Sequence, residues 1–565
     1  MIRVFIIIRV IKDMKRLCIF SAVFFSTFFV AANAGNAKIN RPIVDLKNGR
    51  VQGISDHGMF IYRNIPFAAP PVGEWRWRPP QPVKNWEGIL DASKFGQACP
   101  QPSIKGLNET IAPGNEDCLK LNVYAPKAAK KAPVMVWIHG GALITGAASE
   151  SYYEPINLIK EGVIVVTIDY RLGKLGFFAP TELSEESRQN NEPVGNYGLM
   201  DQIAALKWVH DNITSFGGDA DNVTIFGESA GGRSVVWLMT SPSAKGLFNK
   251  AIAESAQQTP LRYQKIDKPG LVSQEEMDAK FISSRGAKDL KDLRSMPADK
   301  ILVTPQEYQN GAFGGAFIDG SIIIDNPIPL FAEGKQYKIP FMIGTNSWDA
   351  SFFVPGQPPV DAYLAKMGQD RHIIDNLYAD FKNKCALSAE IMADGWYHGS
   401  AKLLADSAGQ YAPSYAYYFD YLTPKIRTSH PGSPHTFEIP YVFGSMAFVL
   451  PPPASFESNT DQCSLITKAS DDLKSNARWS NYWFPMSDAR NKEDIYMSEQ
   501  MSKSWAAFAK TGNPNYNSKI NWPTYNLPQD TMREFSHGPN KLIKELKKDR
   551  INYQIRILKA MYSLR

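Results

Sequence analysis

The sequence predicts an α/β protein with a central, mostly parallel sheet and helices on both faces. Strand-like apolar runs lie at residues 134–138, 163–168 and 223–226, and a helical pattern at 199–212 separates the last two. Continuous apolar strands that alternate with helices are typical of a parallel sheet covered on both sides. No linker, low-complexity tract or fixed repeat is evident from about residue 41 to 540. We therefore expect one large domain.

The first 34 residues have the features of a secretory signal peptide. Two basic residues precede an apolar run at 17–32, and the small residues Ala-Asn-Ala at 32–34 suit a signal peptidase. The run has 16 residues, fewer than the roughly 20 that span a membrane. We expect residues 1–34 to be removed, residues 35–540 to form the folded domain, and the protein to be secreted or periplasmic.

Positive charge is concentrated at the two ends of the chain. The net charge is +6, of which the first 34 residues carry +4 and the last 25 carry +6, leaving −4 for the rest. The body of the protein therefore offers no basic surface of the kind that binds nucleic acid. We expect no nucleic-acid partner.

Four cysteines remain after the signal segment, namely Cys99, Cys118, Cys385 and Cys463. An even number in an exported chain suggests disulfide bonds. Cys99 and Cys118 would close a small loop rich in Pro, Gly and Asn, whereas the sequence leaves the pairing of Cys385 and Cys463 open. The chain has no C-x-x-C pair and no H-E-x-x-H helix, so we expect no metal site.

The best candidate nucleophile is Ser229. The strand-like run 223–226 stops at Gly227, and the sequence Gly-Glu-Ser-Ala-Gly at 227–231 leads into a segment compatible with a helix. A G-x-S-x-G turn between a strand and a helix holds its serine in a strained conformation and lifts the hydroxyl clear of the sheet edge. This pattern indicates nucleophilic catalysis.

A serine nucleophile needs a base and an acid that orients the base. When the serine lies on such a turn, the acid follows it in the chain and stands after a strand end. Asp349 meets this condition, five residues beyond the strand-like run 340–344. Asp319 and Asp325 are rivals, but each borders a Gly or Pro turn, where an aspartate more often caps its own backbone.

The base must be one of the five histidines after Asp349. His430 and His435 both lie in a loop rich in helix-breaking residues, and the residues by themselves leave the two open. Because the base must be neutral and a histidine ordinarily titrates near pH ~6.5, we expect activity to rise from acid toward neutral pH.

An oxyanion hole requires backbone N–H donors aimed at the developing negative charge. One donor comes from the residue after the nucleophile, here Ala230, and others from a glycine-bearing loop after an earlier strand. The sequence His-Gly-Gly-Ala at 139–142 ends the run 134–138. Gly140, Gly141 and Ala142 are therefore the remaining candidates.

Several distinct motifs follow one another along the chain from about residue 42 to 530. They are Ile65–Ala68, Glu116–Leu119, Trp137–Gly141, Gly195–Leu199, the serine turn, His435–Phe443 and Phe508–Pro514. With these motifs the chain resembles the type-B carboxylesterases, the family that includes cholinesterases, several lipases and bacterial para-nitrobenzyl esterases. The resemblance implies an α/β-hydrolase fold. It also implies hydrolysis of small to medium apolar carboxylic esters through an acyl-enzyme intermediate, without a cofactor.

The resemblance also implies roles for individual residues. It selects His435 as the base, supports Asp349 as the acid, and maps the family's first disulfide onto Cys99 and Cys118. The chain departs from the usual pattern in having Asp349 for a glutamate and Ala142 for a third glycine.

The alternatives are a lipase that acts on longer-chain esters and a catalytically silent binding protein. No tryptophan lies between Cys99 and Cys118, and in cholinesterases a tryptophan of this loop stacks on the cationic substrate. We therefore do not expect a cholinesterase. The adhesion proteins of the family lack the nucleophilic serine, so the presence of Ser229 counts against a silent protein.

The last segment, residues 541–565, is predicted to be a basic helical tail. Ile551, Ile555, Leu558 and Tyr562 fall on one helical face. Such a face is compatible with a homodimer contact, with a membrane-surface contact, or with packing on the chain's own domain.

Overall fold

The computed structural model describes residues 41–564, apart from a set of internal segments. Those segments are 104–110, 266–271, 305–306, 308–310, 312, 351–357, 368–370, 382–383, 425, 429, 446–490, 520 and 539–540. The chain from Arg41 onward forms one compact unit.

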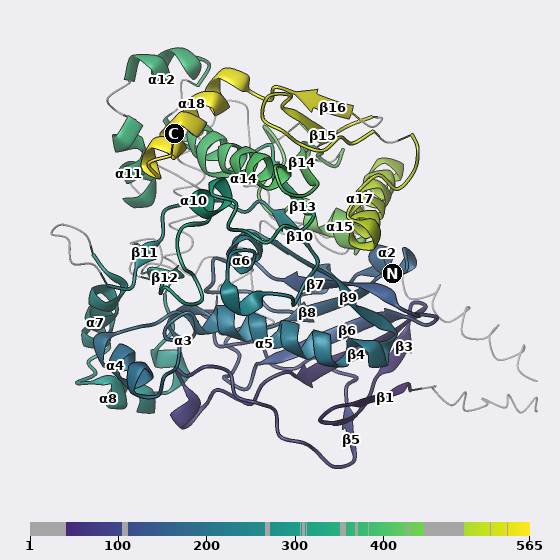
Figure 1. Ribbon diagram of the computed structural model, residues 1–565, viewed down its shortest axis with the longest axis vertical. Helices are drawn as coiled ribbons and strands as arrows, with labels where there is room; N and C mark the ends of the chain where they lie inside the picture. Colours follow the sequence, from purple (N-terminus) through teal and green to yellow (C-terminus); the bar gives the residue numbers. More distant parts are fainter. Residues whose placement is uncertain are drawn as a thin grey trace, which may run out of the picture. The chain divides into compact units, whose positions relative to one another are not determined.

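The described residues contain a sheet of 11 strands (Figure 1). Seven neighbouring strands run parallel to one another. In spatial order they are β8 (Ile164–Ile168), β7 (Ala132–Ile138), β9 (Gly218–Glu228), β10 (Lys250–Glu254), β13 (Phe341–Asn346), β14 (Ser414–Phe419) and β15 (Thr531–Phe535). The prediction of a central, mostly parallel sheet is confirmed.

Antiparallel strands extend this sheet at both edges. On one side lie β6 (Lys120–Pro126), β4 (Met59–Pro66) and β3 (Ile54–Asp56), and on the other lies β16 (Lys541–Lys544). Two small separate sheets are formed by β1 (Ile43–Leu46), β2 (Gly49–Gln52) and β5 (Ile89–Asp91), and by β11 (Arg262–Tyr263) and β12 (Phe317–Ile318). The sequence did not predict these strands, because most are short and mix polar with apolar residues.

Alternate side chains of the central strands enter two separate cores. Met135 and Trp137 of β7 belong to the core that also contains residues of α2 (Ile156–Lys160), α15 (Ile439–Phe443) and α17 (Lys492–Thr511). Val134 and Val136 belong to the other core, with residues of α5 (Tyr197–Asn212), α6 (Ala230–Leu238) and α14 (Ser400–Gly409). Because successive strand residues point to opposite faces, each strand serves both cores.

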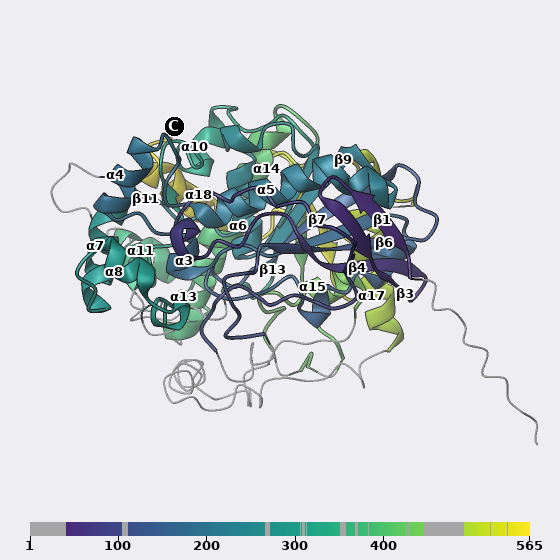
Figure 2. The same cartoon turned by 90° about the horizontal axis from the view of Figure 1, so that it is seen from below.

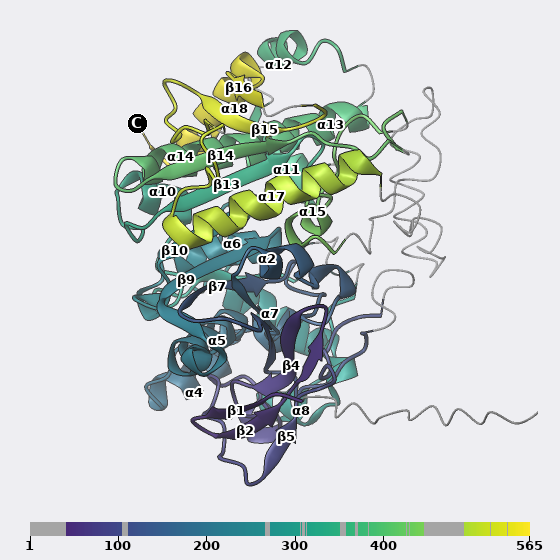
Figure 3. The same cartoon turned by 90° about the vertical axis from the view of Figure 1, so that its right-hand side faces the viewer.

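Helices therefore cover both faces of the sheet. Figure 2 shows α5, α6 and α14 on one side and α15 and α17 on the other. Figure 3 shows the long α17 running across its face of the sheet. This arrangement confirms the expected α/β architecture.

The chain forms further helices in addition to those named above. They are α3 (Gly173–Gly176), α4 (Thr181–Gln189), α7 (Gln274–Ser284), α8 (Leu290–Ser295), α10 (Pro327–Ala332), α11 (Pro358–Met367), α12 (Arg371–Leu377), α13 (Lys384–Met392) and a π-helix, η7 (Ala393–Gly399). Gly286, with φ +70°, separates α7 from α8, because a residue in the left-handed region ends an α-helix.

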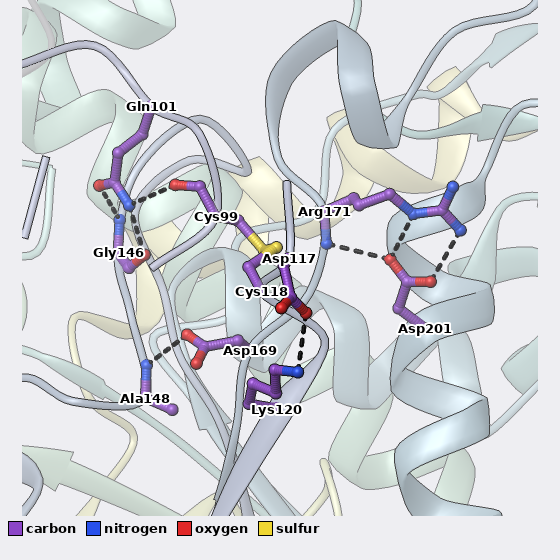
Figure 4. The surroundings of a disulfide bond; sticks show 10 residues. All are labelled: Cys99, Gln101, Asp117, Cys118, Lys120, Gly146, Ala148, Asp169, Arg171 and Asp201. Atoms are coloured by element: carbon purple, nitrogen blue, oxygen red, sulfur yellow. Dashed lines mark hydrogen bonds and ion pairs between the residues drawn. A yellow bond between two sulfur atoms is a disulfide. The ribbon is translucent and has the colours of Figure 1, made fainter. Parts of the chain in front are cut away.

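A buried ion pair joins the end of β8 to helix α5. The Arg171 guanidinium donates from Nε and Nη2 to the two carboxylate oxygens of Asp201, both at 2.8 Å (Figure 4). Bidentate geometry of this kind is the strongest form of an arginine–carboxylate contact. The pair fixes α5 beside the carboxyl end of the sheet.

The C-terminal segment is part of the same compact unit. Residues 541–544 form β16, and α18 (Lys548–Met561) follows. Ile551, Ile555 and Leu558 are buried in the core of the domain. The apolar face of the tail is thus covered by the chain itself, so these side chains are not available for the dimer or membrane contact that the sequence also allowed.

Several expectations fall outside the described residues. They are the signal peptide at 1–34, Cys463 and the side chain of Cys385. In the part of the chain that the structure does describe, no helix is long and apolar enough to span a membrane.

Candidate active site

Ser229 lies on the turn between β9 and α6, as the sequence predicted. Its backbone has φ 55° and ψ −120°, a strained conformation for a residue other than glycine. The Ser229 N–H donates to the Glu254 carbonyl at 2.9 Å, and only 8% of the residue is exposed. The surrounding structure therefore holds the serine in place at the carboxyl end of the sheet.

Glycines on either side of Ser229 allow the turn to press against β7. A Cβ on Gly231 would lie 1.9 Å from the Ile138 carbonyl oxygen, and one on Gly227 would lie 2.6 Å from it. Both distances are below any van der Waals contact. The G-x-S-x-G pattern is thus explained by close backbone packing.

Asp349 and His435 are brought together, although 86 residues separate them. His435 Nδ1 lies 2.6 Å from Asp349 Oδ1, and the Asn346 N–H donates to Asp349 Oδ2 at 2.9 Å. Asp349 is fully buried, whereas 12% of the His435 side chain is exposed. This is the contact expected of an acid that orients a histidine base.

Backbone contacts join the loops that carry the two residues. The Trp348 N–H donates to the Ser433 carbonyl at 2.9 Å, and the Asn346 side chain donates to the Pro434 carbonyl at 2.8 Å. Strand β13 also runs to Asn346 rather than Gly344, because its pairing with β14 continues for two more residues. Asp349 is therefore three residues beyond the end of the strand.

The rival residues are engaged elsewhere. Asp319 accepts the N–H groups of Ser321 and Ile322 at 2.6 and 2.7 Å, and Asp325 accepts the N–H of the next residue. Both cap their own turns, as their sequence context indicated. His430 Nδ1 lies 3.3 Å from the Ile426 carbonyl, so this histidine bonds to its own loop.

Sequence reasoning missed a cluster of buried carboxyl groups around the imidazole. Glu228 Oε1 lies 3.2 Å from His435 Nε2, and Glu228 immediately precedes Ser229. Burial raises the pKa of Glu228 well above its ordinary value, and the nearby Glu438, Asp349 and Glu254 raise it further. The uncharged form of Glu228 is therefore favoured beside the ring.

Burial likewise raises the pKa of Glu254 and of Glu438. Trp505 Nε1 donates to Glu254 at 2.8 Å. Two of the three glutamates lie within motifs that carried the family resemblance. Their residue types alone gave no sign that they would be buried together, since a glutamate is exposed in most proteins.

The candidate oxyanion donors lie next to the serine. A Cβ on Gly140 would meet Ser229 Cβ at 3.3 Å, so this loop packs directly on the turn. Gly141 and Ala142 have φ of +99° and 57°, and no hydrogen bond among the described residues uses their N–H groups. Ala230 begins α6, and an N–H of the first helical turn has no partner within the helix.

The loop after β7 is held by its neighbours. The Tyr170 hydroxyl donates to the His139 carbonyl at 2.7 Å, and the two rings stack with centroids 4.3 Å apart. The Ala148 N–H donates to Asp169 Oδ1 at 2.8 Å. Burial raises the pKa of Asp169 to about 7 and lowers the pKa of His139 to about 4.

The predicted disulfide between Cys99 and Cys118 is present, with 4.9 Å between the two Cα atoms. Across the described ranges, no group of three or more His, Cys, Asp or Glu side chains could hold a metal ion.

The parallel sheet and the serine turn define an α/β-hydrolase. The family model of the carboxylesterase family matches residues 40–395 and 470–554. The chain belongs to the carboxylesterase family, and it is a carboxylester hydrolase. The matched residues include Ser229 and Asp349, whereas His435 lies between the two matched stretches.

Relatives and solved structures agree with this assignment. The chain is 35% identical to the para-nitrobenzyl esterase of Bacillus subtilis, over 86% of this chain and 92% of that protein. It is 31% identical to the fumonisin B1 esterase of Sphingopyxis macrogoltabida, over 89% and 87%. A structure of a PNB esterase, 30% identical, superposes with a TM-score of 0.73 over 91% of this chain and 99% of that one.

We predict that Asp349→Asn abolishes most of the hydrolytic activity. The amide can donate to Nδ1 and so favours the tautomer whose proton sits on Nε2, where a base cannot accept another. In a serine–histidine–aspartate triad this change lowers kcat by about 10⁴. Steady-state kinetics of both variants would test this, with Asp319→Asn as the matched control. Comparable kcat values for the two variants would contradict the assignment of the acid.

We predict that Asp169→Asn stabilises the protein increasingly as the pH rises. Asparagine keeps the oxygen that accepts the Ala148 N–H but cannot ionise. The Asp169 pKa is about 7 in the folded protein and about 3.9 when unfolded. Ionisation of Asp169 therefore lowers the stability of the parent from about pH 4 to about pH 7, and the variant lacks this one contribution. Urea midpoints across this pH range would measure it, and a gap independent of pH would refute it.

Proposed function

We propose that Ser229, His435 and Asp349 form the catalytic triad of this esterase, and that its substrates are small to medium apolar esters. The observation that carries the proposal is the 2.6 Å contact between His435 Nδ1 and Asp349 Oδ1. Ser229 lies on a strained turn. It directly follows Glu228, whose Oε1 is 3.2 Å from His435 Nε2.

In this mechanism the Ser229 hydroxyl attacks the ester carbonyl while His435 Nε2 accepts its proton. Asp349 keeps the other proton on Nδ1 and stabilises the imidazolium. The N–H groups of Gly141, Ala142 and Ala230 bind the oxyanion, with Gly140 packing their loop on the turn. His435 then protonates the departing alcohol, and water, activated by the same ring, releases the acid from the acyl-enzyme.

Two features support small to medium apolar substrates. Ser229 is only 8% exposed, which favours a compact acyl group over a bulky one. The buried Tyr397 ring lies against the imidazole of His435, with centroids 5.6 Å apart, so the surroundings of the base are partly apolar. The name of the Bacillus relative, a para-nitrobenzyl esterase, points to the same class of ester. Lipase activity on longer chains is the alternative.

Hydrolysis of p-nitrophenyl esters from acetate to palmitate would test the proposal, with Ser229→Ala compared at each length. We expect the highest kcat/KM at short or medium acyl length and its loss in the variant. An optimum at long chains would favour the lipase alternative. Hydrolysis that survives in Ser229→Ala would overturn the triad.

We also propose that residues 1–34 direct export and are then removed. The basic residues, the apolar run and the small residues at 32–34 support this. Amino-terminal sequencing of the exported protein should begin at Gly35. A mature protein that retains the apolar run would show instead that the segment is an anchor.

A further inference from the structure

We propose that Gln101 is a positioning residue of the oxyanion hole, which it holds in shape from the disulfide loop. This inference deepens the proposed function and rests on its oxyanion donors. Gln101 lies close to the disulfide, and its side-chain amide bonds to the backbone of Gly146 (Figure 4). Gly146 is at the far end of the loop that begins at His139.

The contact between Gln101 and Gly146 is a two-way clamp. Gln101 Nε2 donates to the Gly146 carbonyl at 3.0 Å, and the Gly146 N–H donates to Gln101 Oε1 at 3.0 Å. Nε2 also donates to the Cys99 carbonyl at 3.1 Å. The residue is fully buried, so water does not replace any of these bonds if the side chain is removed.

Gly146 is packed against the start of the same loop. Its φ is +107°, and a Cβ there would lie 2.4 Å from His139 Nδ1 and 2.7 Å from the Gly140 carbonyl oxygen. The backbone of Gly146 thus forms a direct support for the residue that precedes Gly141 and Ala142. A shift of Gly146 would move the candidate donors.

The intervening residues transmit such a shift because they form a bonded turn. The N–H groups of Ile144 and Thr145 both donate to the Gly141 carbonyl at 3.0 Å. Gly141 is therefore tied to the residue that immediately precedes Gly146. The clamp holds one end of this turn, and the serine turn contacts the other through Gly140.

The disulfide gives Gln101 a rigid base. Cys99 is bonded to Cys118, two residues before β6, which pairs with β4 and β8 in the central sheet. The Gln101 N–H also donates to the Pro113 carbonyl at 2.9 Å. The amide is thus anchored to the sheet on one side and bonds the oxyanion loop on the other.

Removal of the clamp should weaken binding of the transition state more than binding of the ester. The loss of one oxyanion donor costs about 10²–10³ in kcat, and misplacement by about 1 Å can cost about 10²-fold. The ground-state ester carbonyl depends much less on these donors. A positioning role therefore appears in kcat, with KM nearly unchanged.

The test compares Gln101→Met, which is of similar size and lacks both polar groups, with Gln101→Glu, which keeps the acceptor for the Gly146 N–H. Kinetics would use a short p-nitrophenyl ester. The probe for the hole would be 1,1,1-trifluoro-2-octanone, whose carbonyl carbon bonds to Ser229 Oγ while its carbonyl oxygen becomes the oxyanion. Its inhibition constant measures oxyanion binding directly.

We expect Gln101→Met to lower kcat about tenfold or more, to raise the inhibition constant by a similar factor, and to change KM less than about twofold. Gln101→Glu should lose at least as much, because its second carboxyl oxygen faces the Cys99 and Gly146 carbonyl oxygens in place of the amide donors. A matched control is Asn515→Leu, in the loop after α17. The Asn515 amide makes the same kind of two-way contact, because Nδ2 donates to the Trp522 carbonyl at 2.9 Å and the Trp522 N–H donates to Oδ1 at 2.8 Å. Its kcat should equal that of the parent.

Parental kcat and inhibition constant in either folded Gln101 variant would overturn the proposal. So would an equal loss of kcat in Asn515→Leu, because it would show a general effect of loosening the fold. The urea midpoint of each variant identifies the folded ones. The Ser229→Ala variant separates this outcome from failure of the triad itself. If the triad were wrong, Ser229→Ala would still hydrolyse the ester, whatever the Gln101 variants do.

Discussion

The close backbone packing around Ser229 is the constraint on which the rest of the site depends. A Cβ on Gly231 would lie 1.9 Å from the Ile138 carbonyl, and one on Gly232 would lie 2.5 Å from the Glu254 carbonyl. Strands β7, β9 and β10 can meet at the serine turn only because both residues are glycine. This contact brings the loop after β7 to the nucleophile, so the backbone of the sheet places the candidate oxyanion donors.

The same packing has an electrostatic consequence. It removes water from Glu228, Glu254 and Glu438, and burial together with repulsion from neighbouring carboxyl groups raises the pKa of each. The uncharged form of Glu228, which faces His435 Nε2, is thereby favoured. Asp349 is the carboxyl group that bonds Nδ1. The two ring nitrogens of His435 thus face different carboxyl groups, Glu228 at Nε2 and Asp349 at Nδ1.

Much of the parallel sheet was predictable because its strands are continuous apolar runs with glycine at their ends. The serine turn was predictable for a related reason, since its glycines mark a strained strand-to-helix junction. Asp349 could be proposed from its place after a strand. His435 could not be separated from His430 by residue chemistry, and the family resemblance decided between them. The edge strands escaped prediction because short strands with mixed polarity have no distinct period.

The sequence by itself determined the class of the protein, the order of four central strands along the chain and the candidate nucleophile Ser229, because local patterns report local backbone geometry. Only the tertiary structure decided that Asp349 meets His435 and that Gln101 bonds Gly146. It also decided that the three glutamates are buried together and that the apolar face of α18 is covered by the chain. Each of these contacts joins residues far apart in sequence, and their spacing along the chain carries no record of the distance between them in the fold.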